Sequence, residues 1–295
     1  MAIAIEAPTT SKLKPSTGPG LFGVKTWKKT RLAIALIFAL ISMVPLLYMV
    51  SLSFQPMSTI GAGTFQLLPT HPTTQNYLQA WDTVDLGRLL LNSTIVAAGT
   101  VVLTVICASL AAFAFARYKF RFREVIFYLF LASLAVPTVE LVIPQYLLMD
   151  RLHLIDSLVG LILIYVSANL PFSIFLLRGF FEAVPRELEE SLRLDGASNL
   201  RVLTNLLAPL SIPALAVVAL FAFNAAWDEF PVALTLINSS PHFTVQIGLA
   251  LFQGSHTTEW GPLFAASVVA TVPNIIVFTI SQRWFKSGVS LGGIR

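Results

Sequence analysis

The residues best able to make specific polar contacts lie between Glu182 and Pro213, the longest charged interruption in an apolar chain. Pro185 suits the first position of a short helix, where its missing N–H costs nothing. Three glutamates then fall in the first turns, where negative charge complements the helix dipole: Glu187, Glu189 and Glu190. Gly196 predicts the end of this helix, because glycine readily adopts the left-handed conformation. The stretch therefore offers carboxylate and guanidinium groups for ion pairs and hydrogen bonds on a short helix.

A second helix is predicted directly after the glycine. Ser198 can cap its N-terminus, and a leucine-rich run from Leu200 to Leu207 follows. The local prediction is a short helix, a glycine turn and a second helix that enters a membrane. An ordinary charged loop between two membrane spans is the alternative on these residues alone.

Motifs for nucleotide binding or metal chemistry are missing from the sequence. There is no G-x-x-x-x-G-K-[ST] and no Gly-Lys dipeptide, so a P-loop for ATP phosphates is not expected. The single cysteine, Cys107, excludes an internal disulfide and a multi-cysteine metal site. Four histidines stand far apart and are interpreted as solvated: His71, His153, His242 and His256. We expect no enzyme activity, metal or cofactor on this chain, so ATP-driven work would need ATP and Mg bound by another chain.

Composition indicates an integral membrane protein. Of 295 residues, 56% are hydrophobic and only 12% are charged, with a mean hydropathy of +0.77, whereas a soluble domain is about a quarter charged. Six apolar segments are each near the ~20 residues that cross a bilayer. They are Leu32–Ser53, Leu89–Ala116, Val125–Met149, Leu158–Leu177, Leu206–Trp227 and Leu263–Arg283. The predicted fold is all-α, a polytopic membrane protein with six transmembrane helices.

Charge predicts how these spans are oriented. With the N-terminus inside, all but Arg88 and Arg151 of the 19 Lys and Arg residues fall in cytoplasmic segments. Both termini and the charged loop at 182–205 are then cytoplasmic. The net charge of +4 thus reflects topology, and no nucleic-acid partner is expected. We expect a flexible tail over residues 1–30, a six-helix domain over 31–285 and a cytoplasmic tail over 286–295.

The spacing within the charged loop carries a family resemblance. Glu190-Ser191-Leu192 is followed after three residues by Gly196, and after nine more by Leu206-Leu207-Ala208-Pro209. This resembles the EAA loop of bacterial ABC-importer permeases, E-A-A, three residues, G, nine residues, I-x-L-P. Ser-Leu replaces Ala-Ala, and Ala208 replaces the Leu. In that family the loop forms the coupling helix, which docks into a cleft on a cytoplasmic ATPase subunit.

The resemblance covers about residues 25–295 and is closest to the sugar-importer branch, the maltose-type inner-membrane permeases. Further stretches similar to that branch are Asn92-Ser93, Leu152–Ser157, Arg178–Phe181, Asp195–Ser198 and the glycine-rich end Gly288–Arg295. The resemblance implies a bacterial plasma (inner) membrane protein. Its implied partners are a second homologous permease, two ATPase subunits and an extracytoplasmic sugar-binding protein.

The implied function is to form half of the translocation path for a di- or oligosaccharide of the trehalose or maltose type. Seven residues would contact the ATPase or shape the coupling helix, with Glu190 the first candidate: Arg186, Glu189, Glu190, Ser191, Arg193, Asp195 and Gly196. A permease for another solute, such as glycerol phosphate, is the alternative within importers. An ion-coupled secondary carrier and a structural membrane scaffold are the alternatives from other classes.

Candidates for the substrate path are polar residues within the spans. Glu140 is a carboxylate inside the third span, where a charge is costly and often functional. Four others offer amide groups and an aromatic face suited to a sugar: Asn169, Asn224, Trp227 and Asn274. Hydrogen bonding between helices is the alternative role for these four. A ridge of Ala108, Ala112 and Ala116 permits close helix approach, either within this chain or against a sister permease.

Overall fold

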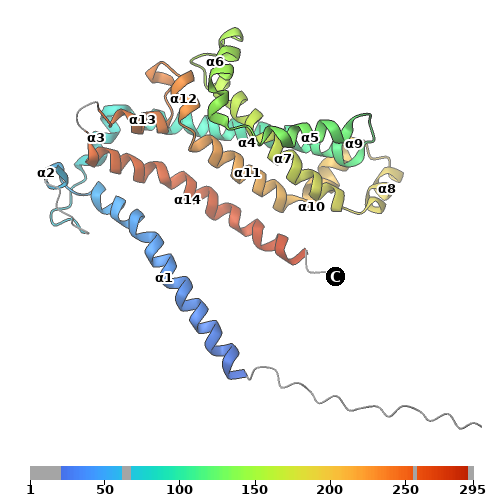
Figure 1. The fold of residues 1–295 in the computed structure, drawn as a ribbon, viewed down its shortest axis with the longest axis horizontal. Helices are drawn as coiled ribbons and strands as arrows, with labels where there is room; N and C mark the ends of the chain where they lie inside the picture. Colours follow the sequence, from blue (N-terminus) through green and yellow to red (C-terminus); the bar gives the residue numbers. More distant parts are fainter. Residues whose placement is uncertain (1–20, 62–67, 255–257, 292–295) are drawn as a thin grey trace, which may run out of the picture. The chain divides into compact units, whose positions relative to one another are not determined.

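The computed structural model describes residues 21–61, 68–254 and 258–291, and these are helices and connecting loops (Figure 1). Within the described residues, the sole β-type pairing is an isolated bridge between Gln253 and Thr258. The all-α prediction is therefore confirmed. Four helices are long and apolar enough to cross a membrane, or up to six if each of two bent helix pairs is one span.

The chain divides after Met49 into two units. Helix α1 (Leu21–Ser53) contains the predicted first span and Pro45. It begins at Leu21, ten residues before the expected start of the domain at residue 31, and no proline lies between Pro19 and the basic segment to interrupt it. Residues 1–20 of the expected tail lie outside the described residues.

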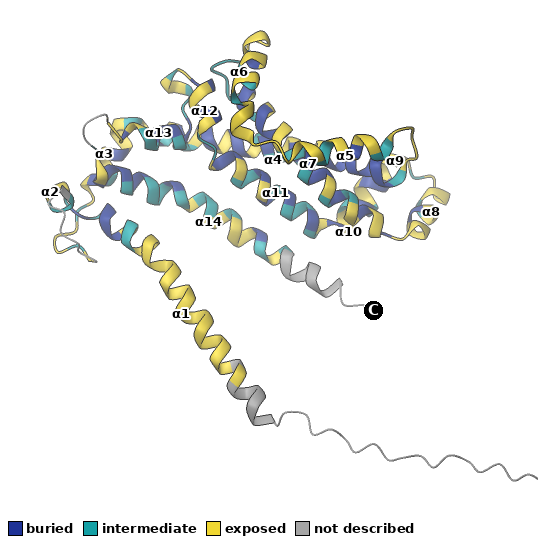
Figure 2. Cartoon of the chain, viewed as in Figure 1, coloured by how far each residue is buried: buried dark blue, intermediate teal, exposed yellow. Residues whose placement is uncertain are grey.

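In the second unit, α4 (Leu86–Arg117), α7 (Leu158–Ala183), α11 (Ile212–Trp227) and α14 (Trp260–Leu291) pack together (Figure 1). Their facing sides are buried and their outer sides exposed (Figure 2). Helix α14 extends to Leu291, so the expected tail over 286–295 is helical in its first part, and residues 292–295 lie outside the description.

The alanine ridge packs inside this chain. Ala108, Ala112 and Ala116 are buried in one cluster with Ile174 and Leu177 of α7. Small side chains let the two helices approach closely. Of the two roles open for the ridge, internal packing is the one observed.

The predicted third span is broken. Helix α5 (Arg123–Ser133) ends before a 3₁₀ turn (Thr138–Leu141) that leads into α6 (Val142–Arg151), and the two parts are bent by 98°. Pro137 lies at the break with an extended backbone, and proline also disfavours a helical residue before it. The span predicted from Val125 to Met149 is therefore two helices joined by a bend, and it is one of the two bent pairs that can each count as a single span.

The predicted fifth span is also bent. Helix α9 (Asn199–Val202) continues through a π-helical turn (Leu203–Leu207) into α10 (Ala208–Leu210). An 85° bend at Ser211 then separates this segment from α11. The bend lies between Pro209 and Pro213, which both lack the N–H that would continue the hydrogen-bond ladder.

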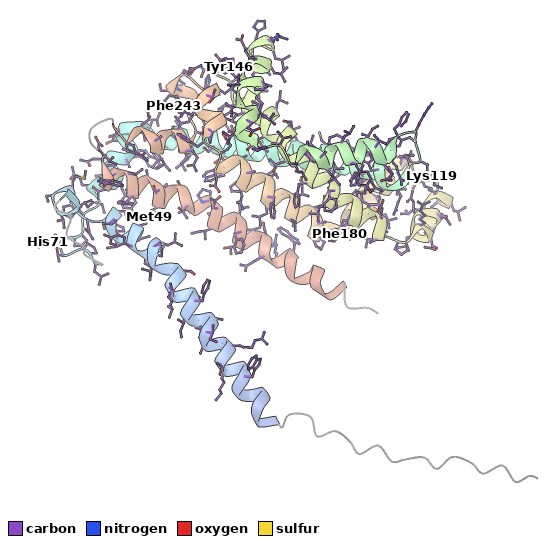
Figure 3. All side chains as sticks on the ribbon, in the orientation of Figure 1. Met49, His71, Lys119, Tyr146, Phe180 and Phe243 are labelled. Atoms are coloured by element: carbon purple, nitrogen blue, oxygen red, sulfur yellow. The ribbon has the colours of Figure 1, made fainter. Side chains whose placement is uncertain are left out.

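The two ends of the second unit carry different elements (Figure 1). At one end lie α8 (Arg186–Leu194), α9 and the start of α5, and Figure 3 labels Lys119 there. At the other lie α3 (Gln75–Val84), α12 (Pro231–Leu236) and α13 (Val245–Leu251), near α2 (Met57–Gly61) and a 3₁₀ turn (Ser240–His242). The basic loops at 117–123 and 183–205 thus lie at the same end of the second unit.

Candidate functional site

Helix α8 begins one residue later than expected. Pro185 is the residue before the helix, in an extended conformation, and Arg186 is the first helical residue. Glu187 and Glu189 occupy the first turn, as the dipole argument predicted. The helix therefore starts where the sequence changes from the apolar α7 to the charged stretch.

The C-terminus of α8 is closed by two backbone hydrogen bonds. The Gly196 N–H donates to the Arg193 carbonyl (3.0 Å), and the Ala197 N–H donates to the Leu192 carbonyl (3.0 Å). Gly196 has φ +81°. This is the Schellman arrangement, which needs a left-handed residue just after the helix. Ser198 then caps α9 by accepting from the Arg201 N–H at 3.3 Å, as predicted.

A buried ion pair attaches α8 to the end of α4. Glu189 Oε2 lies 2.7 Å from Arg117 Nε, and the two side chains are only 9% and 6% exposed. The other oxygen of Glu189 accepts from Arg193 Nη2 at 2.7 Å. Arg117 also donates to the Val184 carbonyl at 3.1 Å, just before α8. One carboxylate and one guanidinium thus join α4, the end of α7 and α8.

The same residues line an open cavity of about 230 Å³: Arg117, Arg186, Glu189, Glu190 and Arg193. Glu190 is exposed, and its side chain makes no hydrogen bond or ion pair within the described part of the chain. Ser191 donates to the Leu188 carbonyl, and Asp195 is exposed. Leu194 is 90% exposed at the end of the helix. Helix α8 is thus held on one side and presents charged side chains and two exposed leucines, Leu188 and Leu194, on the others.

Arg117 is the member of this site that sequence reasoning missed. The sequence places it among the basic residues that set topology, and it was not among the candidates for this site. Its position at the end of the run A-A-F-A-F-A-R was the available signal, because a basic residue at a helix C-terminus can bind carbonyls and carboxylates nearby. Its partner Glu189 was included, but the sequence could not distinguish it from the exposed Glu190.

A second arginine fixes the neighbouring helices. Arg178 of α7 donates to both oxygens of Glu124 on α5 (2.9 and 3.1 Å) and to Glu182 (2.8 Å). Its guanidinium also lies 4.1 Å from the ring centroid of Phe127. Bidentate and stacked geometry of this kind needs an arginine. Helix α8 therefore follows directly on α7, and α7 is itself joined to α5 by the ion pairs of Arg178.

Comparison with known proteins identifies the family. Residues 101–291 match the family model described as "Binding-protein-dependent transport system inner membrane component". This chain belongs to that family. It is 32% identical over 265 residues to the diacetylchitobiose uptake system permease protein NgcG of Streptomyces coelicolor, covering 89% of this chain and 87% of that protein. It is 33% identical over 264 residues to the trehalose/maltose transport system permease protein MalG of Thermococcus litoralis, covering 88% and 94%.

The fold agrees with a solved structure. A chain of a bacterial ABC transporter involved in the import of the acidic polysaccharide alginate superposes with a TM-score of 0.77 at 23% identity, covering 95% of this chain and 100% of that one. With the family and the apolar helices, this makes the protein a multi-pass permease of the inner membrane.

The candidates for the permease's substrate path lie at the broken third span and on α7, α11 and α14. Glu140 is exposed in the 3₁₀ turn at the broken span. Asn169 donates to the Tyr165 carbonyl within α7 at 2.8 Å, and Asn274 donates to Asp228 at 3.3 Å. Trp227 is buried and donates to the Ala270 carbonyl at 3.1 Å. Asn224 is half-buried in α11. Asn224, Trp227 and Asn274 therefore lie near one another where the end of α11 meets α14, whereas Glu140 and Asn169 belong to the broken span and to α7.

At the opposite end, Asp156 holds two loops of the permease together. Its carboxylate accepts from the Asn238 and Ser239 N–H groups, each at 3.0 Å, and lies 3.5 Å from His242. Hydrogen bonding by Ser239, first from its side chain, lowers the pKa of Asp156 from 3.8 to about 2. Asn92 adds bonds to the Pro241 and Phe243 carbonyls, both at 2.9 Å.

The Asp156 contacts predict a pH dependence of stability. Because its folded pKa is depressed, the contribution is complete above pH 3.8 and is lost as pH falls toward 2. Between pH 6 and pH 3, Tm of the wild type in detergent should fall further than that of Asp156→Asn, by on the order of 2 °C. Asp150→Asn, at an exposed aspartate of α6, should follow the wild type. Equal losses in wild type and Asp156→Asn would contradict this role.

Proposed function

We propose that this chain is a permease subunit of an ATP-driven importer and forms half of the path for a sugar. The observation that carries the proposal is α8, a short charged helix that is held by a buried ion pair and is exposed on its other sides. Such a helix can dock on another protein without losing its position in this one. The proposed solute is a di- or oligosaccharide delivered by an extracytoplasmic binding protein.

Mechanical coupling would proceed through the contacts of α8. Force applied to α8 reaches α4 through Arg117 and Glu189, and reaches α7 through Val184. It reaches α11 through the helical segment Asn199–Leu210. Because these contacts join α8 directly to α4 and to the end of α7, displacement of α8 would move the spans rather than bend the loop. We propose that Glu190, Arg186, Arg193 and Leu194 contact the ATPase.

Energy for import would come from partner chains. We propose two ATPase subunits that bind ATP and Mg, a second homologous permease that completes the path, and a sugar-binding protein outside. The sugar class rests on the similarity to permeases named for diacetylchitobiose and for trehalose/maltose uptake. Glycerol phosphate import, ion-coupled transport and a scaffold role remain the alternative outcomes of the test.

The test is purification of the tagged full-length chain from its native membrane in mild detergent, followed by mass spectrometry and by uptake assays of diacetylchitobiose, maltose and trehalose. We expect an ATPase, a second permease and a binding protein to co-purify with the chain. We also expect ATP-dependent uptake of at least one of the disaccharides. Recovery of the chain alone, with uptake driven by an ion gradient, would overturn it.

A further inference from the structure

The length of α5 covers about half the thickness of a membrane before the third span breaks. Helix α5 starts at the end that carries α8 and has 11 residues, about 16 Å at 1.5 Å per residue. The hydrocarbon core is about 30 Å thick. Non-helical backbone at this depth is tolerated only where it is buried in protein or lines a water-filled space. The exposed carboxylate of Glu140 in the same segment likewise needs to face protein or a water-filled space and not lipid.

A cavity of about 180 Å³ opens at this break. Ser133, Thr138 and Gln145 line it from the bent pair α5–α6, and Ser167, Ala168 and Pro171 line it from the middle of α7. Tyr146, the neighbour of Gln145 on α6, is labelled in Figure 3. The volume is about six times the share of one water in the liquid. It is therefore suited to a single sugar ring and not to a whole oligosaccharide.

Several polar atoms of this cavity are free to accept hydrogen bonds. Gln145 Oε1 is buried and has no hydrogen-bond partner among the described residues. The hydroxyls of Ser133 and Ser167 donate to the Phe130 and Ile164 carbonyls (2.6 and 2.7 Å), which leaves their oxygens to accept. Pro171 has no N–H for the carbonyl four residues earlier, so Ser167 loses its usual helical donor. No charged residue lines the described walls.

We propose that this cavity is a subsite that holds one neutral sugar unit half-way along the path, with Gln145 Oε1 accepting from a sugar hydroxyl. A ligand for these walls should bring hydrogen-bond donors and no negative charge, which fits a neutral hexose ring and disfavours phosphate esters and other anions. Val136, Leu141 and Pro171 supply apolar surface for the C–H face of the ring. The inference rests on the proposed function and adds residues that sequence reasoning did not select.

The first experiment replaces Gln145 in the assembled transporter and measures uptake of diacetylchitobiose, maltose and trehalose. Gln145→Leu removes the acceptor and should raise KM roughly three- to tenfold for the transported disaccharide. Stimulation of ATP hydrolysis by the loaded binding protein should persist, because the coupling helix is untouched. Gln75→Leu, at an exposed glutamine of α3, is the matched control and should leave KM unchanged.

The second experiment uses cysteine accessibility. In a Cys107→Ala background, Ser167→Cys should react with a membrane-impermeant methanethiosulfonate, and the transported disaccharide should slow the reaction several-fold. Leu129→Cys, exposed on α5, should show no protection by sugar. An unchanged KM in Gln145→Leu, or labelling of Ser167→Cys that no disaccharide slows, would overturn the subsite. If wild-type uptake shows no dependence on ATP, the proposed function itself has failed.

Discussion

Replacing Gly196 by Val should remove most of the sugar uptake while the chain still inserts into the membrane. Gly196 has φ +81°, and a residue with a Cβ pays about 1–2 kcal/mol in the left-handed region. A penalty of this size changes the ratio of two conformations by a factor of about 5–30. Because the Schellman bonds that end α8 require this conformation, the helix would lose its fixed exit toward α9. ATP hydrolysis by the reconstituted complex should then continue without transport.

Two further variants control for the added side chain. Gly179→Val adds the same side chain in α7, where nothing lies within 4 Å of the new Cβ, and should keep most of the uptake. Gly196→Asn should retain more activity than Gly196→Val, because asparagine tolerates the left-handed region better. Normal uptake by Gly196→Val would contradict the account of α8 as a lever.

Replacing Glu189 by Gln should destabilise the chain by about 3–5 kcal/mol, since it leaves a buried guanidinium without its counter-charge. Arg117 is only 6% exposed and lies 2.7 Å from the carboxylate. The loss also frees α8 from α4, so uptake should fall together with thermal stability in detergent. Thermal unfolding and uptake, measured on the same preparations, test this directly.

The adjacent glutamate provides the matched control. Glu190 is exposed, so Glu190→Gln should change the free energy of unfolding by no more than about 0.5 kcal/mol. If Glu190 contacts the ATPase as proposed, its loss should reduce uptake without reducing stability. The double replacement Arg117→Met with Glu189→Leu should recover much of the lost stability, because apolar residues can substitute for a buried pair. Equal stability of Glu189→Gln and Glu190→Gln would contradict the structural role given to Glu189.

Local signals in the sequence were sufficient to predict α8 and the turn and helix that follow it. The proline before it, the glutamates in its first turn, the left-handed Gly196 and the Ser198 cap each act within a few residues of where they lie. The long apolar helices α1, α4, α7 and α14 were also predicted, because a run of about twenty apolar residues is typical of a helix that crosses a membrane.

Long-range pairing and breaks within spans were not predictable in the same way. Hydropathy does not distinguish a straight span from one bent by 98°. Pro137 can be recognised as the site of the bend only when the positions of the two flanking helices are known. The pairing of Glu189 with Arg117 joins residues that are far apart in the sequence. For the same reason, the cavity beside Gln145 could not be deduced, since it forms only where α7 meets the break.

The most direct test of the central claim, that α8 docks on an ATPase, is site-specific photo-crosslinking from Leu194 in native membranes. Leu194 is 90% exposed at the end of α8, so p-benzoylphenylalanine at this position should leave folding and uptake intact. We expect a crosslink to an ATPase subunit from position 194 and none from Leu68, which is 75% exposed in the segment between α2 and α3. Intact uptake with no ATPase crosslink from position 194 would contradict the claim.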